Sequence, residues 1–118
     1  MAHLFYYLGT CSTCQRIMKE IPNLKRFTLR EIKSNPITAE ELDAMRELAG
    51  SYEALFSRRA MKFRQMGLHE RTLTEDDYRT LILQEYTFLK RPVMVLEGRI
   101  LIGSSKKVVE EMVAAAGQ

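Results

Sequence analysis

Two cysteines three residues apart, Cys11 and Cys14, are the side chains of this sequence best suited to chemistry. They frame the segment Cys11-Ser12-Thr13-Cys14, which lies between a short apolar run and a stretch with helical spacing. A thiolate near a helix N-terminus is stabilised by free backbone N–H groups and by the helix dipole, which lowers a cysteine pKa from about 8.5 to between about 3.5 and 7.5. We therefore predict that Cys11 is the attacking sulfur. Cys14 would then displace the product by forming the Cys11–Cys14 disulfide.

A zinc site is the main alternative for two cysteines at this spacing. Structural zinc requires four ligands, of which cysteine and histidine are the commonest. The chain has two cysteines and two histidines, and His3 and His69 have no useful spacing. The ligand count therefore argues against a bound metal. A Cys-x-x-Cys motif beside a strand-helix-strand pattern instead indicates a thioredoxin-like redox motif.

The surrounding pattern is that of an α/β protein. Apolar residues at helical spacing follow Cys14 as far as Pro22, and the 27–32 segment alternates, with Phe27 and Leu29 on one side. The last third has a Glu97-Gly98 turn between two apolar runs, then a final helix. We expect strands at about 3–8, 27–32, 92–96 and 100–102. The order β-α-β, helical insertion, β-β-α predicts a mixed sheet with helices packed on it.

The middle of the chain is predicted to be helical. Thr38 with Glu41, and Thr74 with Asp77, stand at the spacing that starts a helix, and apolar residues follow each pair at helical intervals. We therefore expect a single domain over 1–118, with a core at about 1–34 and 87–118 and a helical insertion at about 35–86.

Composition sets limits on the class of protein. The chain has 118 residues, 46% hydrophobic and 28% charged, which suffices for a core without disulfides or a metal. Its formal charge of +3 is mild and does not indicate direct nucleic-acid binding. The start carries no basic leader, and no apolar stretch approaches the roughly 20 residues that span a bilayer. We expect a cytoplasmic monomer without a membrane partner.

A proline at the predicted start of the third strand gives a second candidate feature. In the run Leu89-Lys90-Arg91-Pro92, a proline that opens a strand removes no ladder hydrogen bond. One interpretation is a strand-start signal alone. The other is a cis-proline packed opposite the thiols, which leaves a backbone edge available to substrates.

Taken together and in this order, these motifs resemble the ArsC family. This family includes glutaredoxin-linked arsenate reductases, Spx redox regulators and YffB-type thiol reductases. The resemblance extends over nearly the whole chain and implies a thioredoxin-like core with an inserted helical subdomain and a cis peptide before Pro92. It rests on Cys11-Ser-Thr-Cys14, Asn35-Pro36, Ser57-Arg58-Arg59 with Phe63, Leu89-Lys90-Arg91-Pro92-Val93 and Leu101-Ile102-Gly103.

The resemblance also implies roles for individual residues. It makes Cys11 the nucleophile, and it makes Arg91 and Arg59, in preference to Arg58, the arginines that bind an oxyanion. Two guanidinium groups suit that ligand because each presents a planar fork of donors. The alternative for Arg59 is a place on the solvated face of a short helix. Further anion-binding candidates, equally interpretable as plain turn residues, are Thr10, Ser12 and Thr13.

Three departures separate this chain from the arsenate reductases of the family. Their nucleophile has a His-x3-Cys-x3-Arg setting, whereas Tyr7 and Gln15 stand at the flanking positions here and Arg16 is displaced by one residue. A third family arginine falls where this chain has Gly103. Those reductases also commonly lack a cysteine at the position of Cys14. The differences favour a dithiol protein that acts on a disulfide or a glutathione adduct.

Two functions of different classes follow. The first is a thiol oxidoreductase in which Cys11 attacks arsenate, a glutathione mixed disulfide or a protein disulfide. Glutathione, glutaredoxin or thioredoxin would then reduce the Cys11–Cys14 disulfide, with no tightly bound cofactor. The alternative is an Spx-like regulator that binds RNA polymerase and uses the same cysteines as a sensor. A purely structural protein is disfavoured by the presence of both cysteines and Arg91.

Overall fold

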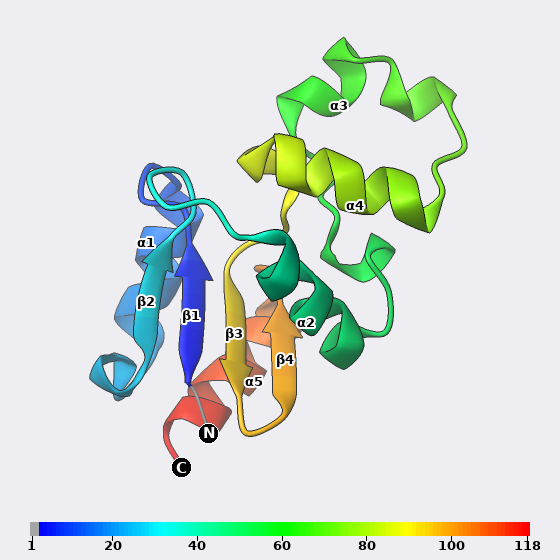
Figure 1. The fold of residues 1–118 in the computed structure, drawn as a ribbon. Coiled ribbons are helices and arrows are strands. Elements are labelled where there is room, and N and C mark those ends of the chain that lie inside the picture. The colour runs from blue at the N-terminus through cyan, green and yellow to red at the C-terminus, as the bar shows by residue number, and fades with distance from the viewer. Residues whose placement is uncertain (1–2) are drawn as a thin grey trace. The chain divides into compact units, whose positions relative to one another are not determined.

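The computed structural model describes residues 3–118, and Figure 1 shows the order of their helices and strands. Residues 1 and 2 lie outside the described residues. They belong to the predicted core segment 1–34 and to the start of the chain, where no basic leader was expected. The mixed α/β architecture predicted from the sequence is confirmed. Its elements are β1 (Leu4–Tyr7), α1 (Ser12–Glu20), η1 (Leu24–Arg26), β2 (Thr28–Glu31), α2 (Ala39–Ala49), η2 (Glu53–Leu55), α3 (Met61–Gln65), η3 (Leu68–Glu70), α4 (Glu75–Gln84), η4 (Tyr86–Phe88), β3 (Val93–Leu96), β4 (Arg99–Ile102) and α5 (Lys106–Ala116), where η marks a short 3-10 helix.

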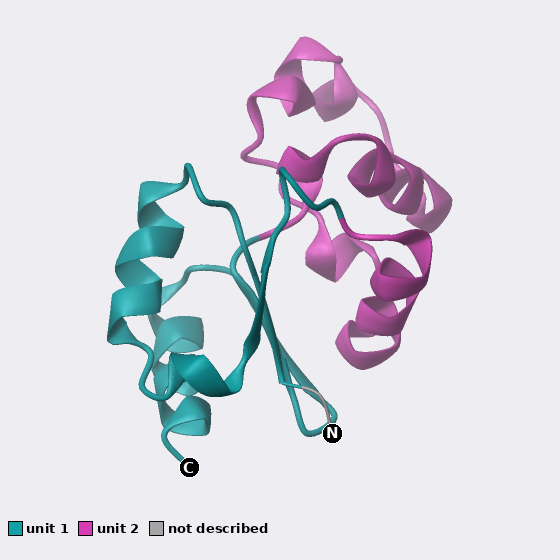
Figure 2. Ribbon diagram, turned by 60° about the vertical axis from the view of Figure 1, so that its left-hand side comes forward, with its two compact units in different colours: residues 1–36, 91–118 teal, residues 37–90 magenta. Residues whose placement is uncertain are grey.

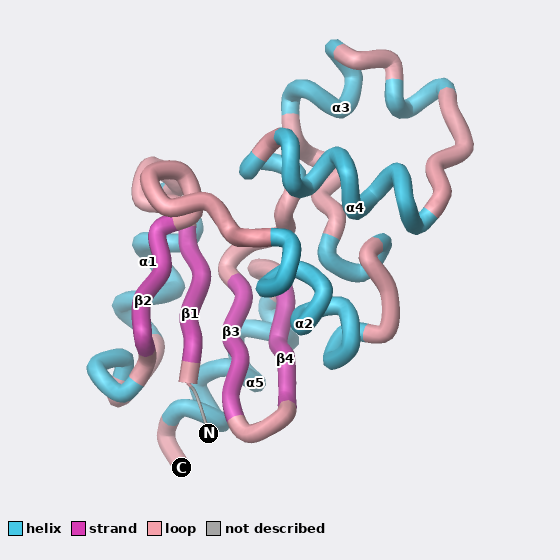
Figure 3. The backbone as a smooth tube through the Cα atoms, in the orientation of Figure 1, coloured by secondary structure: helices cyan, strands magenta, loops and turns pink. Residues whose placement is uncertain are grey.

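The chain forms two compact units, coloured separately in Figure 2. Unit 1 contains the described residues up to Pro36 and the segment Arg91–Gln118. Unit 2 contains Ile37–Lys90. All four strands belong to unit 1, whereas the described elements of unit 2 are helical (Figure 3).

The sheet of unit 1 has the order β2-β1-β3-β4. β1 and β2 are parallel, with Leu4 opposite Thr28 and Tyr7 opposite Glu31. β3 is antiparallel to both β1 and β4. Because β1 and β2 run the same way, the loops that follow them leave the same edge of the sheet. The loop after β1 leads to the cysteine pair.

One face of this sheet is covered by α1 and α5 (Figure 2). Both helices are amphipathic, so their apolar residues meet those of the strands in one core. The buried members are Phe5, Ile17, Ile21, Phe27, Met94, Leu96, Leu101, Met112, Ala115 and Ala116. Phe27 is buried, whereas Leu29, which the alternation places on the same side, is 44% exposed. It pairs with the buried Phe5, but β2 is an outer strand of the sheet.

Unit 2 is built from helices around an aromatic cluster. Phe56 is fully buried, and its ring lies 5.1 Å from that of Phe88 and 4.8 Å from that of Tyr78. As predicted, α2 and α4 each begin with a capping box, at Thr38 and Thr74. No helix among residues 3–118 has the length and apolar character needed to cross a membrane.

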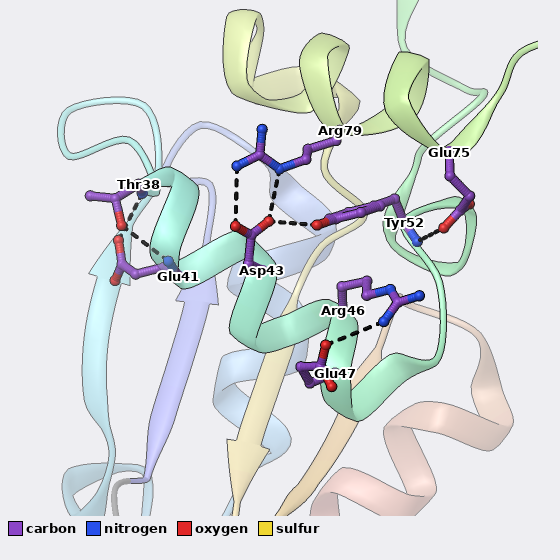
Figure 4. Close-up of polar contacts among 8 residues, drawn as sticks. All are labelled: Thr38, Glu41, Asp43, Arg46, Glu47, Tyr52, Glu75 and Arg79. Carbon is purple, nitrogen blue, oxygen red and sulfur yellow. Dashed lines mark hydrogen bonds and ion pairs between the residues drawn. The ribbon is translucent and has the colours of Figure 1, made fainter.

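Ion pairs join the helices of unit 2. The Asp43 carboxylate of α2 accepts hydrogen bonds from Arg79 Nε at 2.8 Å and from the Tyr52 hydroxyl at 2.5 Å (Figure 4). Glu75 at the start of α4 accepts from the N–H of Tyr52 at 2.8 Å. The connection between α2 and α4 is therefore held by carboxylates from both helices.

Candidate functional site

Cys11 is the N-cap residue of α1. The helix begins at Ser12, two residues earlier than the sequence pattern suggested, and Cys11 has an extended backbone with φ −88° and ψ 113°. The carbonyl of Cys11 accepts the first helical hydrogen bond from the N–H of Gln15 at 3.1 Å. Cys14 consequently lies within the first turn of the helix. The earlier start places both sulfurs at the helix N-terminus.

The surroundings of Cys11 favour its thiolate. Partial burial raises the pKa of this thiol, but the N–H groups of Cys14 and Thr13 and the Cys14 thiol lower it. The positive charge of Arg91 lowers it further, and the net result is a pKa below the ordinary value. α1 has no acidic residue in its first turn that would oppose this effect. Cys11 is only partly buried, so the sulfur that favours the charged form is also the more accessible of the two.

Cys14 has the opposite character. It is 0% exposed, and burial raises the pKa of its thiol to about 11. The charge of Cys11 and the hydrogen bond to it raise this pKa as well, while the Leu8 N–H and Arg91 offset the rise only in part. At neutral pH Cys14 is therefore a thiol that can donate a hydrogen bond to the Cys11 sulfur. The two cysteines are chemically distinct although both are free thiols in this structure.

Arg91 and Pro92 belong to the same unit as the cysteines. The peptide bond between them is cis, as the second interpretation of this proline and the family resemblance both predicted. The carbonyl of Pro92 accepts a hydrogen bond from the N–H of Gly103 at 2.9 Å, which ties the start of β3 to the turn after β4. Arg91 acts electrostatically on both sulfurs.

The other predicted site residues have different settings. Thr13 supplies an N–H to the Cys11 sulfur, and Thr10 and Ser12 are exposed beside it in sequence. Arg59 lies in unit 2, so its approach to an anion at Cys11 stays a prediction. Its neighbour Arg58 donates to Glu53 at 2.7 Å and to the Tyr78 hydroxyl at 2.8 Å. These contacts give Arg58 a structural role within unit 2.

Glu31 is a polar neighbour of the site that the sequence analysis did not single out. Its carboxylate accepts a hydrogen bond at 2.7 Å from the N–H of Gly9, two residues before Cys11. The side chain of Gln15 donates at 2.6 Å to the carbonyl of the same glycine. The topology could have indicated this residue. Glu31 ends β2, which runs parallel to β1, so it lies at the same edge of the sheet as the loop that leads from β1 to Cys11.

Within the described part of the chain, no three His, Cys, Asp or Glu residues gather closely enough to hold a metal ion. The groups brought together at this site are the two thiols, the N-terminus of α1 and the charge of Arg91.

A mixed four-stranded sheet, a Cys-x-x-Cys pair at the start of the first helix and a cis-proline opening the third strand together define a thioredoxin-like fold. The sequence model of the ArsC family matches residues 6–112. The chain belongs to the ArsC family, as its motifs indicated.

Relatives of known name or structure include both regulators and reductases. The global transcriptional regulator Spx 2 of Bacillus anthracis is 25% identical over 111 residues, which are 92% of this chain and 84% of that protein. An ArsC family related protein from Bacteroides fragilis is 28% identical, with a TM-score of 0.77 over 95% of this chain and 98% of that chain. A possible arsenate reductase from Streptococcus mutans is 27% identical, with a TM-score of 0.71 over 93% and 96%.

Proposed function

We propose that this protein is a thiol oxidoreductase that reduces a disulfide or a glutathione mixed disulfide. The observation that carries the proposal is the contrast within the cysteine pair. A partly exposed Cys11 has a lowered pKa, and a fully buried Cys14 with a pKa of about 11 lies in the same helical turn. An exposed thiolate beside a protected thiol is the arrangement that two-step thiol–disulfide exchange requires.

The reaction follows from these properties. The Cys11 thiolate attacks one sulfur of the substrate disulfide, forms a mixed disulfide and releases the other sulfur as a thiolate. The negative charge on Cys11 is then gone, which removes one of the causes that raise the pKa of Cys14. Cys14 loses its proton and attacks the Cys11 sulfur, so the second half of the substrate leaves as a thiol. Two electrons have passed to the substrate, and a thiol reductant such as glutathione, glutaredoxin or thioredoxin returns them to the Cys11–Cys14 disulfide.

Two features favour a disulfide over arsenate as the substrate. Gly103 has φ +101°, a conformation that strains any residue with a side chain, and it stands where the resemblance places an oxyanion-binding arginine. Gln15 stands where the reductases have another arginine, and its side chain is bonded to the Gly9 carbonyl. The charge of Arg91 lowers the pKa of Cys11, which supports a thiolate at this position.

The test couples the purified protein to NADPH oxidation through glutathione–glutaredoxin or through thioredoxin. The substrates are a glutathionylated peptide, a protein disulfide and arsenate, assayed in parallel. We expect turnover with a disulfide substrate and its complete loss in Cys11→Ser. Cys14→Ser should retain the first step and accumulate a mixed disulfide that intact-protein mass spectrometry detects.

Two results would count against the proposal. The first is turnover with arsenate alone, abolished by Cys11→Ser, which would make the protein an arsenate reductase. The second is a Cys11 that is alkylated with an ordinary thiol pH profile, with a midpoint near about 8.5, because the contrast between the cysteines would then be absent.

A second candidate function is a redox-sensing transcriptional regulator. It is favoured by the match to the global transcriptional regulator Spx 2, which covers 84% of that protein. In this case the Cys11–Cys14 pair would switch between dithiol and disulfide without turnover, and the partner would be RNA polymerase.

Purified RNA polymerase distinguishes the two functions. Its binding to the reduced protein, to the oxidised protein and to a Cys11→Ser/Cys14→Ser variant is measured at equilibrium. Binding that differs between the two redox states and is fixed in the variant supports the regulator. Disulfide turnover without polymerase binding supports the oxidoreductase.

A further inference from the structure

Glu31 links two segments at the carboxyl edge of the parallel strand pair. One carboxylate oxygen, Oε2, accepts from the N–H of Gly9 at 2.7 Å. The other, Oε1, accepts from the N–H of Lys33 at 3.0 Å and from the N–H and hydroxyl of Ser34 at 2.7 and 2.8 Å. One oxygen is thus fixed by the turn after β2, and the second reaches the loop that leads to Cys11. A carboxylate held on one side in this way is a rigid acceptor for the other side.

The Gly9 peptide group is held from both sides. Glu31 accepts from its N–H, while the Gln15 side chain donates to its carbonyl at 2.6 Å. Gln15 lies on α1, so the loop between β1 and α1 is tied to the neighbouring strand and to the helix that it enters. A Cβ at position 9 would stand 3.3 Å from Glu31 Oε2, tighter than an ordinary contact, so a side chain there would have to displace the carboxylate.

This loop determines where the Cys11 sulfur lies. Cys11 follows Gly9 by two residues, and its own N–H donates to the Leu8 carbonyl at 3.1 Å. The pKa of Cys11 is lowered by the N–H groups of Thr13 and Cys14, which act only over hydrogen-bond distances. A small shift of the loop would therefore move the sulfur away from the donors that stabilise its charge.

We propose that Glu31 is a positioning residue which, together with Gln15, clamps the Gly9 peptide and so holds the Cys11 sulfur against the N-terminus of α1. The clamp rests on the proposed thiol function, because it matters only if a Cys11 thiolate is used. Glu31 acts through the backbone and does not itself touch the substrate.

The clamp is present over the whole working pH range. Hydrogen bonds from the N–H groups of Ser34 and Gly9 lower the pKa of Glu31 to about 2. The group therefore remains a carboxylate, with acceptors only, wherever Cys11 is reactive.

Charge and position make opposite predictions for Glu31→Gln. If Glu31 acted only as a nearby negative charge, its removal would lower the pKa of Cys11, because like charges disfavour each other. If it positions the loop, the amide holds the Gly9 N–H less well and the sulfur loses donors, which raises the pKa. The direction of the change therefore distinguishes the two roles.

The experiment measures the rate of Cys11 alkylation by iodoacetamide against pH, in a Cys14→Ser background so that a single thiol reacts. We expect Glu31→Gln to raise the midpoint by about 0.5 pH unit, which is about a threefold loss of thiolate at low pH. The matched control is Asp77→Asn in unit 2, which also removes a carboxylate that accepts a backbone N–H, that of Thr74 at 2.8 Å. It should leave the midpoint unchanged.

Two further variants keep the result decisive. Gly9→Ala presses on the Glu31 carboxylate and Gln15→Met removes the other half of the clamp, and each should raise the midpoint in the same direction. Glu31→Gln and Gln15→Met combined should shift it by less than the sum of the single shifts, because both act through one peptide group. If Glu31→Gln does not fold, Gly9→Ala and Gln15→Met carry the same test.

The outcomes separate this inference from the proposed function. The clamp is overturned if Glu31→Gln lowers the midpoint of Cys11 alkylation, or if all three variants leave it unchanged. In either case, a depressed alkylation midpoint in the unsubstituted chain leaves the proposed thiol function standing. An ordinary midpoint in the unsubstituted chain instead overturns the thiol function, and the clamp with it.

Discussion

Helix α1 of unit 1 and helices α2 and α4 of unit 2 begin in different ways. In unit 2, α2 and α4 begin with capping boxes in which Thr38 or Thr74 accepts a backbone N–H and a carboxylate three residues later accepts in return. Figure 4 shows the box of α2, formed by Thr38 and Glu41. In unit 1, α1 begins at Cys11 with no side-chain cap and no acidic residue in its first turn. The side chains of the capping boxes thus satisfy donors at the N-termini of α2 and α4, whereas in α1 the donors remain available to a charge on sulfur. A helix start that contributes less to stability is the one that supports chemistry.

The largest expected change in the free energy of unfolding comes from replacing each cysteine of the pair by serine. Cys14→Ser places a hydroxyl at a fully buried position and should lower the free energy of unfolding by about 1–3 kcal/mol. Cys11→Ser supplies the missing cap of α1 and should raise it by about 0.5 kcal/mol while thiol reactivity at this position is lost. Urea unfolding under reducing conditions measures both. If both variants lose the same free energy of unfolding, a serine cap does not stabilise the N-terminus of α1.

A cysteine moved to the capped helix sharpens the comparison. In a Cys11→Ser/Cys14→Ser background, Thr38→Cys creates a thiol at the N-cap of α2, where Glu40 and Glu41 occupy the first turn. The nearby carboxylates oppose a thiolate, so its alkylation midpoint should lie above that of Cys11 by on the order of one pH unit, a tenfold difference. A midpoint as low as that of Cys11 would mean that any helix N-terminus suffices, and that Arg91 and the Cys14 thiol add little.

Removing the caps themselves has a smaller effect. Thr38→Ala and Thr74→Ala each leave the N–H of the third helical residue without its hydroxyl acceptor, and each should lower the free energy of unfolding by about 1 kcal/mol. Thr80→Ala, on the exposed surface of α4, is the matched control and should change it by less than about 0.5 kcal/mol. Losses no greater than in the control would remove the proposed difference between α1 and these two helices.

The smallest expected effect is a pH dependence carried by Asp77. The N–H of Thr74, and then its hydroxyl, lower the pKa of this carboxyl. Because the pKa is lowered in the folded state, the stabilisation is complete above the unfolded value of about 4 and is lost as the pH falls below it. Between pH 6 and 2.5 the free energy of unfolding of Asp77→Asn should therefore fall less steeply than that of the unsubstituted protein. Identical slopes would mean that the α4 cap does not titrate.

Local sequence signals predicted the features that depend on neighbouring residues. The capping boxes at Thr38 and Thr74, the turn at Glu97-Gly98 and the cysteine pair at a strand-helix junction each arise from a few adjacent positions. Strand order depends on distant positions, so the sequence predicted a mixed sheet but not the order of its strands. The cis peptide before Pro92 was one of two interpretations, and the family resemblance favoured it.

Contacts between distant positions were beyond the sequence. Glu31 reaches Gly9 across 22 positions, which depends on the parallel pairing of β1 and β2 and on the exact end of each strand. The exposure of Leu29 has the same origin, since alternation alone does not reveal that β2 is an outer strand. The start of α1 at Ser12 was also missed, because Ser12 and Thr13 are typical of turns as well as of first helical residues.

The turn at Gly103 limits how this protein can diversify. Its φ of +101° leaves open space around a would-be Cβ, so the obstacle to a side chain is the backbone and not crowding. An arginine introduced there would need the turn between β4 and α5 to adopt another conformation, and the hydrogen bond from the Gly103 N–H to the Pro92 carbonyl depends on the present one. A side chain at position 103 would therefore require the turn after β4 and its contact with the start of β3 to be rebuilt together.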